Sequence, residues 1–102
     1  MLKESNKNEI LENVKDGKGL QLVVFHATWC GPCRMYKSSL EELSEKDNVE
    51  IYRVDIDQNR EYATEAGVAS IPFTQVYVDG KLVESAAGYK PYTQLKEYIE
   101  KF

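Results

Sequence analysis

The order of hydrophobic patterns along this chain predicts an α/β fold, with a central mixed sheet of five strands flanked by four helices. Strand-like apolar segments alternate with helix-like amphipathic segments over most of the sequence, and this alternation is typical of right-handed crossovers around a parallel sheet. Near the end, two strand-like segments flank Asp79-Gly80. This dipeptide is typical of hairpin turns, so it adds an antiparallel edge to the sheet.

The elements of the first part of the chain follow from local patterns. Residues 1–4 are interpreted as an edge strand. Residues 8–14 have apolar side chains at helical spacing, with Ser5 or Asn6 as the candidate N-cap. Residues 20–27 are almost all apolar, which favours a central strand that is buried on both faces of a parallel sheet.

Patterns of the same kind place the remaining elements. Met35, Leu40 and Leu43 mark the inner side of a second helix. Pro91 stands near the first turn of a last helix, where its missing N–H costs nothing. The residues expected on the inner side of that last helix are Leu95, Tyr98, Ile99 and Phe102. The segments between these two helices are a strand over 49–56, a helix over 57–66, and strands over 73–78 and 81–86.

Length and composition predict one domain, residues 1–102, that works as a monomer. Hydrophobic residues make up 42% and charged residues 29% of the chain, a balance typical of globular proteins. The net charge is −4 with acidic and basic residues interspersed, so a nucleic-acid partner, which requires a basic patch, is not expected. No apolar run reaches about 18 residues, and the N-terminus lacks the apolar segment of a signal peptide. We therefore expect no membrane partner and a cytoplasmic location.

Two cysteines, Cys30 and Cys33, enclose Gly31 and Pro32 at the point where the buried strand ends and the second helix begins. The first turn of a helix has free N–H groups and the positive end of the helix dipole, and both favour a thiolate. Pro32 fits this turn because its missing N–H is not needed there. Two intervening residues also let the sulfur atoms meet, so the motif predicts thiol–disulfide exchange.

The positions of the two cysteines predict different roles. Cys30 stands at the mouth of the helix and is the expected nucleophile, while Cys33 lies one turn inside and points toward the core. Cys30 would attack a substrate disulfide to give a mixed disulfide, and Cys33 would then attack Cys30 and release the reduced substrate.

Other uses of a cysteine pair fit the sequence less well. A structural disulfide that closes so short a loop would add only about 2 kcal/mol of stability, and cytosolic thiols are usually kept reduced. A zinc site needs four ligands, and beyond the two cysteines the remaining candidates are one histidine and carboxylates, so neither a metal nor another cofactor is expected. A c-type haem needs His after the second cysteine, where Arg34 stands. Two buried core thiols would not suit the intervening Gly-Pro.

The segment Trp29-Cys30-Gly31-Pro32-Cys33 resembles the signature of the thioredoxin family, and three further features match that family in order. They are Val54-Asp55-Ile56-Asp57 at the end of the following strand, Ile71-Pro72 before the hairpin, and Gly88 after it. The resemblance covers essentially the whole chain. A bare Cys-x-x-Cys is a weak signal, but this motif within a βαβ pattern is specific.

The resemblance implies a substrate-binding surface around the cysteines. Pro72 would be the cis-proline of the family and would face the cysteine turn. The backbone of Ile71 would then be free to pair with an extended substrate strand. A shallow apolar collar around Cys30 would comprise Trp29, Gly31, Pro32, Ile56, Ile71, Pro72 and Gly88. Ile56 and Gly88 have a second interpretation, as a core residue and as a turn residue at the hairpin exit.

The chain differs from the family at two positions that bear on proton transfer from the cysteines. The family usually has a buried Asp six residues before the first cysteine, and here that residue is Val24. His26 stands where the family often has an aromatic residue. It is a candidate proton acceptor because histidine titrates near neutral pH, or else a packed ring tied to a carboxylate such as Asp57. Asp55 and Asp57 are the other candidate acceptors, directly or through water.

Together these features predict a protein-disulfide reductase that a thioredoxin reductase recycles, with disulfide-containing proteins as clients. Gly31-Pro32 is the pair seen in the reducing members of the family. Two alternatives stay open. One is a thioredoxin-like protein that serves a single client or acts as an oxidant or isomerase, and the other is a binding subunit without redox turnover.

Overall fold

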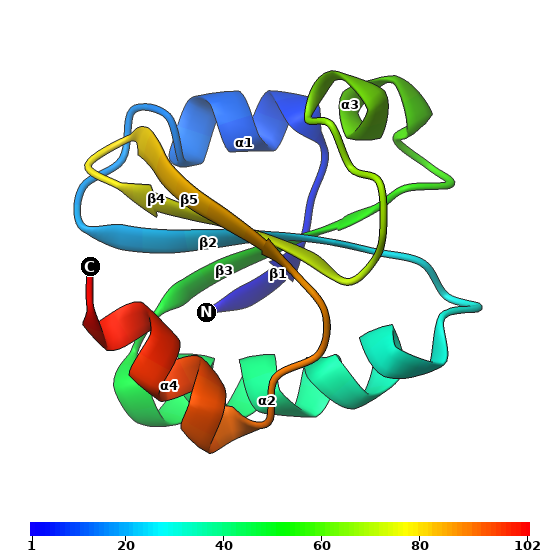
Figure 1. The fold of residues 1–102 in the computed structure, drawn as a ribbon. Helices are drawn as coiled ribbons and strands as arrows, with labels where there is room; N and C mark the ends of the chain where they lie inside the picture. Colours follow the sequence, from blue (N-terminus) through cyan, green and yellow to red (C-terminus); the bar gives the residue numbers. More distant parts are fainter.

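The computed structural model describes residues 1–102, which fold into nine elements in the predicted order β-α-β-α-β-α-β-β-α (Figure 1). The strands are β1 (Leu2–Glu4), β2 (Leu20–His26), β3 (Glu50–Asp55), β4 (Phe73–Val78) and β5 (Lys81–Ala87). The helices are α1 (Lys7–Asn13), α2 (Gly31–Asp47), α3 (Arg60–Glu65) and α4 (Tyr92–Glu100). None of these helices is both long enough and apolar enough to cross a membrane.

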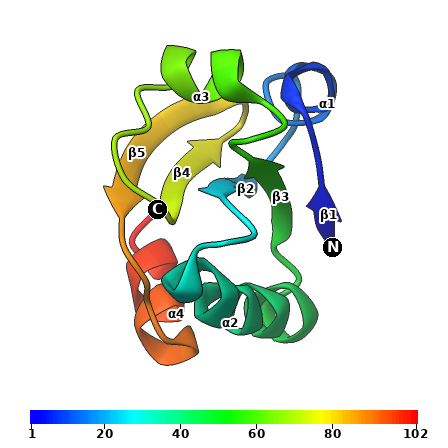
Figure 2. The same ribbon diagram turned by 90° about the vertical axis from the view of Figure 1, so that its right-hand side faces the viewer.

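The five strands form one mixed sheet in the order β1-β3-β2-β4-β5 (Figure 2). β3 lies between β1 and β2 and is parallel to both. β4 is antiparallel to β2 and to β5. β2 is the central strand and is buried over all but its first residue, as its nearly continuous apolar sequence predicts. Its C-terminal end leads directly into the cysteine motif.

Two helices cover each face of the sheet, α1 and α3 on one face and α2 and α4 on the other (Figures 1 and 2). Because side chains alternate along a strand, Val23 and Phe25 of β2 pack in the core beneath α1 and α3. Leu22 and Val24 pack in the core beneath α2 and α4. β2 is therefore packed on both faces, and this packing holds its C-terminal end in a fixed position in the fold.

The inner side of α2 differs from the expectation in one residue. Tyr36, Leu40 and Leu43 are buried, whereas Met35 is exposed over 57% of its surface. Positions 36, 40 and 43 follow the i, i+4, i+7 spacing of a single helix face, and position 35 lies off that stripe. The expectation that Met35 faces the core was therefore wrong, and Tyr36 takes its place.

The ends of three helices add detail that the sequence left open. Asn6 is the N-cap of α1, because its Oδ1 accepts a hydrogen bond from the Glu9 N–H at 3.0 Å. α3 begins later than expected, because the Asp57 N–H is held by Asp55 Oδ1 at 2.8 Å in a turn before the helix. Phe102 lies beyond the end of α4 and is exposed, so the expectation that it points inward was wrong.

Candidate functional site

The cysteine motif forms the junction between β2 and α2. Cys30 is the N-cap of α2 with extended backbone, and Pro32 stands in the first turn. The Cys33 N–H points at Cys30 Sγ, with a nitrogen–sulfur distance of 3.2 Å. The two Cα atoms lie 5.2 Å apart, and the sulfur atoms are joined as a disulfide. When this bond opens, the same N–H faces the Cys30 sulfur, which favours its thiolate form.

The two sulfur atoms lie in an apolar setting near the surface. Cys30 keeps 6% of its surface exposed and Cys33 keeps 2%. Both pack against Ala27 in a small cluster that Ile56 and Ile71 border. A protein that approaches this end of the sheet therefore meets Cys30 before Cys33.

The loop before β4 faces the cysteine turn. The Ile71–Pro72 peptide bond is cis, as the family resemblance implies, and the carbonyl oxygen of Ile71 lies 4.0 Å from Cys30 Sγ. Ile71 makes no backbone hydrogen bond within the chain, whereas the Pro72 carbonyl accepts one from the Gly88 N–H at 2.8 Å. Free backbone groups of Ile71 therefore stand beside the sulfur, where an extended chain can pair with them.

Gly88 belongs to this arrangement through its backbone. Its φ is 102°, in the region that favours glycine. No atom lies within 4 Å of the position that a Cβ would take, so the conformation and not the available space explains the glycine. Its hydrogen bond to Pro72 also holds the exit of β5 beside the cis-proline loop. This position is compatible with a place in the collar around Cys30 and with a turn residue at the hairpin exit.

Trp29 stands beside the cysteine turn with 64% of its surface exposed. Its indole N–H donates to Asp57 Oδ2 at 2.8 Å. Ile56, next to Asp57, donates its N–H to the carbonyl of His26 at 2.9 Å. The Asp57 carboxylate therefore orients the Trp29 ring. It makes no hydrogen bond to the His26 side chain, so Asp57 is not the carboxylate that holds this ring. The expectation of a packed ring tied to a carboxylate is confirmed, with Glu4 as that carboxylate.

The side chain of His26 is instead held between Glu4 and Arg53. Its Nε2 lies 2.8 Å from Glu4 Oε1 and its Nδ1 lies 2.9 Å from a terminal nitrogen of Arg53. A guanidinium only donates hydrogen bonds, so Nδ1 accepts from Arg53 and Nε2 bears the proton donated to Glu4. Arg53 and Glu4 also form an ion pair at 3.1 Å. The buried ring therefore has no free lone pair with which to accept another proton.

Sequence reasoning did not identify Glu4 and Arg53 as parts of this site. Glu4 pairs with Arg53 across β1 and β3, and Arg53 pairs with Val24 across β3 and β2. One signal was available. Arg53 stands in the middle of the strand predicted over 49–56, and a cation in a buried strand requires a partner.

Val24, at the position where the family usually has an acid, has Arg53 as its cross-strand neighbour on β3 and no carboxylate in its core. Val24 is the cross-strand neighbour of Thr74, and it packs in the same core as Tyr36. Burial raises the pKa of Tyr36 to about 12, so this hydroxyl keeps its proton at neutral pH. No Asp or Glu is buried anywhere in the chain, so no internal carboxylate takes the place of the missing acid.

Two sulfur atoms at disulfide distance, at the start of a helix and beside free backbone, have one characteristic reaction, exchange with other disulfides. The fold and the site therefore define a thiol–disulfide oxidoreductase. The Thioredoxin family model matches residues 1–101. The chain belongs to the thioredoxin family.

Individual relatives agree with the family assignment. The thioredoxin of Bacillus subtilis (strain 168) is 41% identical over 91 residues, which cover 87% of this chain and 88% of that protein. The thioredoxin of Listeria monocytogenes serovar 1/2a is 44% identical over 87 residues, covering 83% of this chain and 84% of that protein. Among solved structures, the N21Q mutant thioredoxin from Halobacterium salinarum NRC-1 matches with a TM-score of 0.89 and 30% identity, over 99% of this chain and 89% of that one.

Proposed function

We propose that this protein reduces disulfides of other proteins, with Cys30 as the nucleophile and Cys33 as the resolving thiol. The observation that supports these roles most directly is the Cys33 N–H directed at Cys30 Sγ at 3.2 Å. It brings a donor at the N-terminus of a helix to one of the two sulfurs, so negative charge is favoured on Cys30. Cys33 is more deeply buried, which suits a thiol that reacts only with its neighbour.

The proposed reaction consists of two displacements. The Cys30 thiolate attacks one sulfur of the client disulfide, a new S–S bond forms, and the other client sulfur leaves as a thiolate. Cys33 then loses its proton and attacks Cys30 Sγ. The bond between Cys30 and the client breaks, and the second client sulfur leaves as a thiolate that takes a proton from water. The client gains two electrons, and the cysteine pair is left as the disulfide.

The client binds, in this proposal, as an extended chain across the collar around Cys30. The free backbone groups of Ile71 pair with the client backbone, and Ile56 borders the same cysteine cluster. Trp29, the most exposed large apolar side chain, adds a contact surface. The full set proposed to contact the client comprises Trp29, Gly31, Pro32, Ile56, Ile71, Pro72 and Gly88.

The proton of Cys33 passes to water in this proposal, and not to the three side chains that the sequence suggests. The acceptor nitrogen of His26 is occupied by Arg53, and the Asp57 carboxylate accepts from Trp29. Asp55 accepts a hydrogen bond from the Asp57 N–H and lines a groove that neither cysteine borders. None of the three is free beside Cys33.

Turnover requires a source of electrons. We propose a thioredoxin reductase for this role and disulfide-containing proteins as clients, because proteins of the thioredoxin family generally act with both. The cytosol is the proposed compartment, since cellular reductants keep thiols reduced there and a dithiol reductant is sustained where its own disulfide is continually reopened.

Single cysteine variants test the two roles. Cys30→Ser should abolish insulin-disulfide reduction, and Cys33→Ser should accumulate client proteins as stable mixed disulfides that survive gel electrophoresis without reductant. The Cys30→Ser protein is the matched control, since it should trap nothing. Trapping by Cys33 in the Cys30→Ser protein, without trapping in the reverse variant, would show that the roles are interchanged.

The midpoint potential of the Cys30–Cys33 couple tests the direction of electron flow. A value near about −270 mV is typical of thioredoxins, whereas a dedicated oxidant lies near about −120 mV. We expect the lower value, measured by equilibration with glutathione or dithiothreitol mixtures. A potential near that of an oxidant would contradict the proposal, and so would full biological function in a variant with both cysteines replaced by Ser.

A further inference from the structure

A row of cations lies beside the cysteine turn. Arg34 and Lys37 project from the first part of α2, and Arg53 projects from β3. All three line one pocket of about 450 Å³. Thr28 lines the same pocket, and so does Ala27, which packs against both cysteines. Arg34, Lys37 and Arg53 are called the basic edge below.

The charge of the basic edge is only partly balanced within the chain. Arg53 pairs with Glu4 at 3.1 Å, and Glu4 is the single carboxylate in the pocket. Arg34 donates to the carbonyl of Thr28 at 2.9 Å. Neither Arg34 nor Lys37 has a carboxylate within 4.0 Å. Two like charges three residues apart on a helix repel each other, so an anion bound between them would relieve this repulsion.

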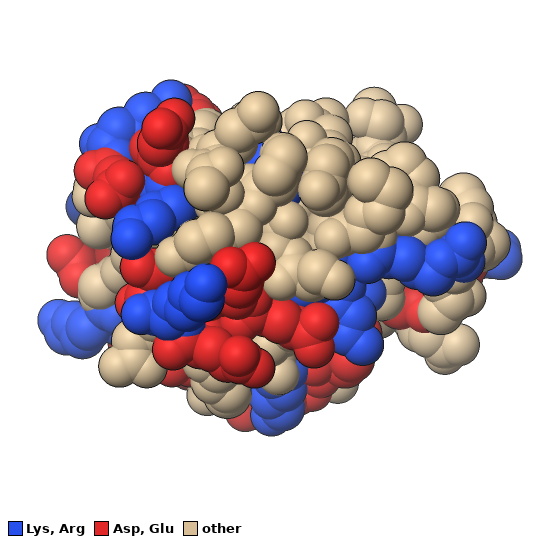
Figure 3. All heavy atoms as spheres, turned by 90° about the horizontal axis from the view of Figure 1, so that it is seen from below, with Lys and Arg blue, Asp and Glu red and all other residues tan.

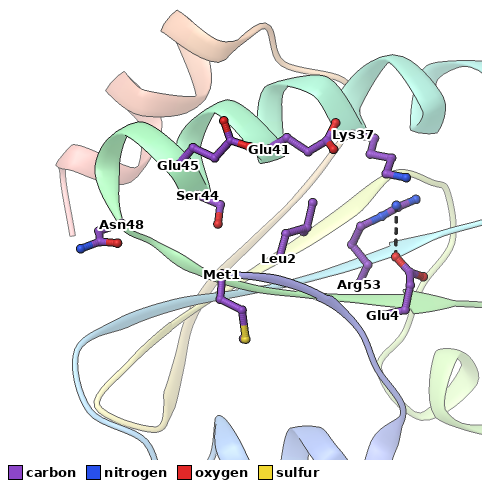
Figure 4. Close-up of a pocket in the computed structure, with 9 residues that line it drawn as sticks. All are labelled: Met1, Leu2, Glu4, Lys37, Glu41, Ser44, Glu45, Asn48 and Arg53. Carbon is purple, nitrogen blue, oxygen red and sulfur yellow. Dashed lines mark ion pairs between the residues drawn. The ribbon is translucent and has the colours of Figure 1, made fainter.

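The basic edge brings three cations to one pocket of a chain whose net charge is −4. In Figure 4, Lys37 from α2 and Arg53 from β3 extend into one groove, while Glu41 and Glu45 follow further along α2. Figure 3 shows acidic side chains gathered over the lower part of this face. A broad uncharged area covers its upper right, with basic side chains along the right-hand end, where α2 begins. At the right-hand end the basic side chains border the uncharged area, whereas at the left-hand end of this face they are mixed with acidic ones.

We propose that the basic edge binds an acidic segment of the client protein close to its reacting disulfide. The inference rests on the proposed function and specifies which clients it favours. Arg34 and Lys37 follow Cys30 by four and seven residues, about 6 and 10 Å along the helix axis. An extended client advances about 3.3 Å per residue. Carboxylates two or three residues from the client cysteine therefore reach the basic edge while the client sulfur contacts Cys30.

The size of the preference follows from the exposure of the cations. Arg34 and Lys37 are both exposed, so each contact with a client carboxylate is modest and is screened by salt. We expect an acidic disulfide peptide to react about three to ten times faster than a basic one at low ionic strength. The ratio should approach one at about 1 M salt, where the screening length falls to about 3 Å.

Three peptides with the same internal disulfide test the inference, with Glu, Gln or Lys at the positions two and three residues from each cysteine. Stopped-flow mixing with the reduced protein gives each rate constant from the fluorescence of Trp29, the only tryptophan of the chain. The wild-type order should be acidic, then neutral, then basic. Arg34→Glu combined with Lys37→Glu should invert that order, and the corresponding double Gln variant should remove the preference.

Lys18→Glu combined with Lys81→Glu is the matched control, because it gives the same net charge through two exposed lysines away from the pocket. It should keep the acidic preference. Equal rates for the three peptides, or an equal loss of preference in this control, would overturn the inference while the neutral peptide still reports the proposed function. Failure of all three peptides to oxidise the protein would overturn the proposed function and the inference together.

Discussion

Tyr36 and Thr74 share a hydrogen bond of 2.9 Å between their hydroxyl groups, and neither side chain has exposed surface. Tyr36 follows Cys33 by one helical turn, and Thr74 follows Pro72 by two residues. The bond therefore links the helix that contains the cysteines to the strand that follows the cis-proline loop. Because the side chains around Tyr36 are apolar, each of the two hydroxyls depends on the other for its hydrogen bond.

Removing the second of these hydroxyls should cost much less stability than removing the first. Tyr36→Phe leaves the Thr74 hydroxyl without a partner, and Thr74→Val leaves that of Tyr36 without one. Each single change should lower the free energy of unfolding by about 1–3 kcal/mol. The double variant should lose little more than either single variant, because no buried hydroxyl is then left unpaired. Urea denaturation of all four proteins measures this, and losses that simply add would contradict it.

Burial of tyrosines also predicts how stability changes at high pH. It raises the pKa of Tyr36 and of Tyr62 to about 12 in the folded protein. In the unfolded chain a tyrosine ionises near pH 10. Above this pH the unfolded state therefore loses protons that the folded state keeps. The free energy of unfolding should be constant just below pH 10 and fall between about pH 10 and 12, by about 1.4 kcal/mol per pH unit for each tyrosine.

The variant Tyr36→Phe isolates one of these two contributions. Between about pH 10 and 12, the slope of its unfolding free energy against pH should be smaller by about 1.4 kcal/mol per pH unit, which corresponds to one proton. Urea titrations from about pH 8 to about pH 12 give the slope. Equal slopes for the parent and Tyr36→Phe would contradict the assignment to Tyr36.

The order of the elements could be predicted because each signal is local. The apolar run at 20–27 indicated β2 as the central strand, and it is. Asp79-Gly80 indicated a hairpin, and both residues have the positive φ that such a turn requires, 50° and 82°. The inner face of a helix is harder to assign, because adjacent residues such as Met35 and Tyr36 differ by only about 100° around the axis.

The reactive site could be predicted only in part, because the sequence signals are local. Cys30 and Cys33 are three residues apart, so one motif reveals both. The contacts of His26 with Glu4 and Arg53 span 22 and 27 residues. They depend on β3 lying between β1 and β2, and local patterns do not determine the order of strands in a sheet. The hydrogen bond between Tyr36 and Thr74 spans 38 residues and could not be predicted from local patterns either.

His26 should prove to be a structural residue. In His26→Phe, the buried Arg53 loses the acceptor at Nδ1, so the free energy of unfolding should fall by about 1–3 kcal/mol. The shape of the pH profile of disulfide reduction should not change, because that nitrogen is already occupied. Insulin reduction between about pH 6 and 9 gives the profile. Glu4→Gln serves as the control that alters the exposed end of the same network. A profile that shifts only in His26→Phe would show that His26 takes a proton.

Val24 offers a direct test of the proposed release of the Cys33 proton to water. Val24→Asp places a carboxyl group in the core beneath α2, and burial should raise its pKa. Val24→Asn introduces a polar group of similar size that cannot accept a proton. Both variants should be destabilised by about 1–3 kcal/mol. A raised pKa in the folded state means that the Asp variant loses further stability as pH rises through that pKa, whereas the Asn variant does not.

The kinetic difference between these two variants should appear in the second displacement. A carboxylate that takes the Cys33 proton acts as a general base, so the Asp variant should release a client from its mixed disulfide faster than the Asn variant, by about tenfold or more. The advantage should be present above the pKa of the new carboxyl group and absent below it, because only the ionised form accepts a proton. Stopped-flow release of a labelled peptide from Cys30 measures the step. Equal release rates in the two variants at every pH would show that proton transfer from Cys33 does not limit the native reaction.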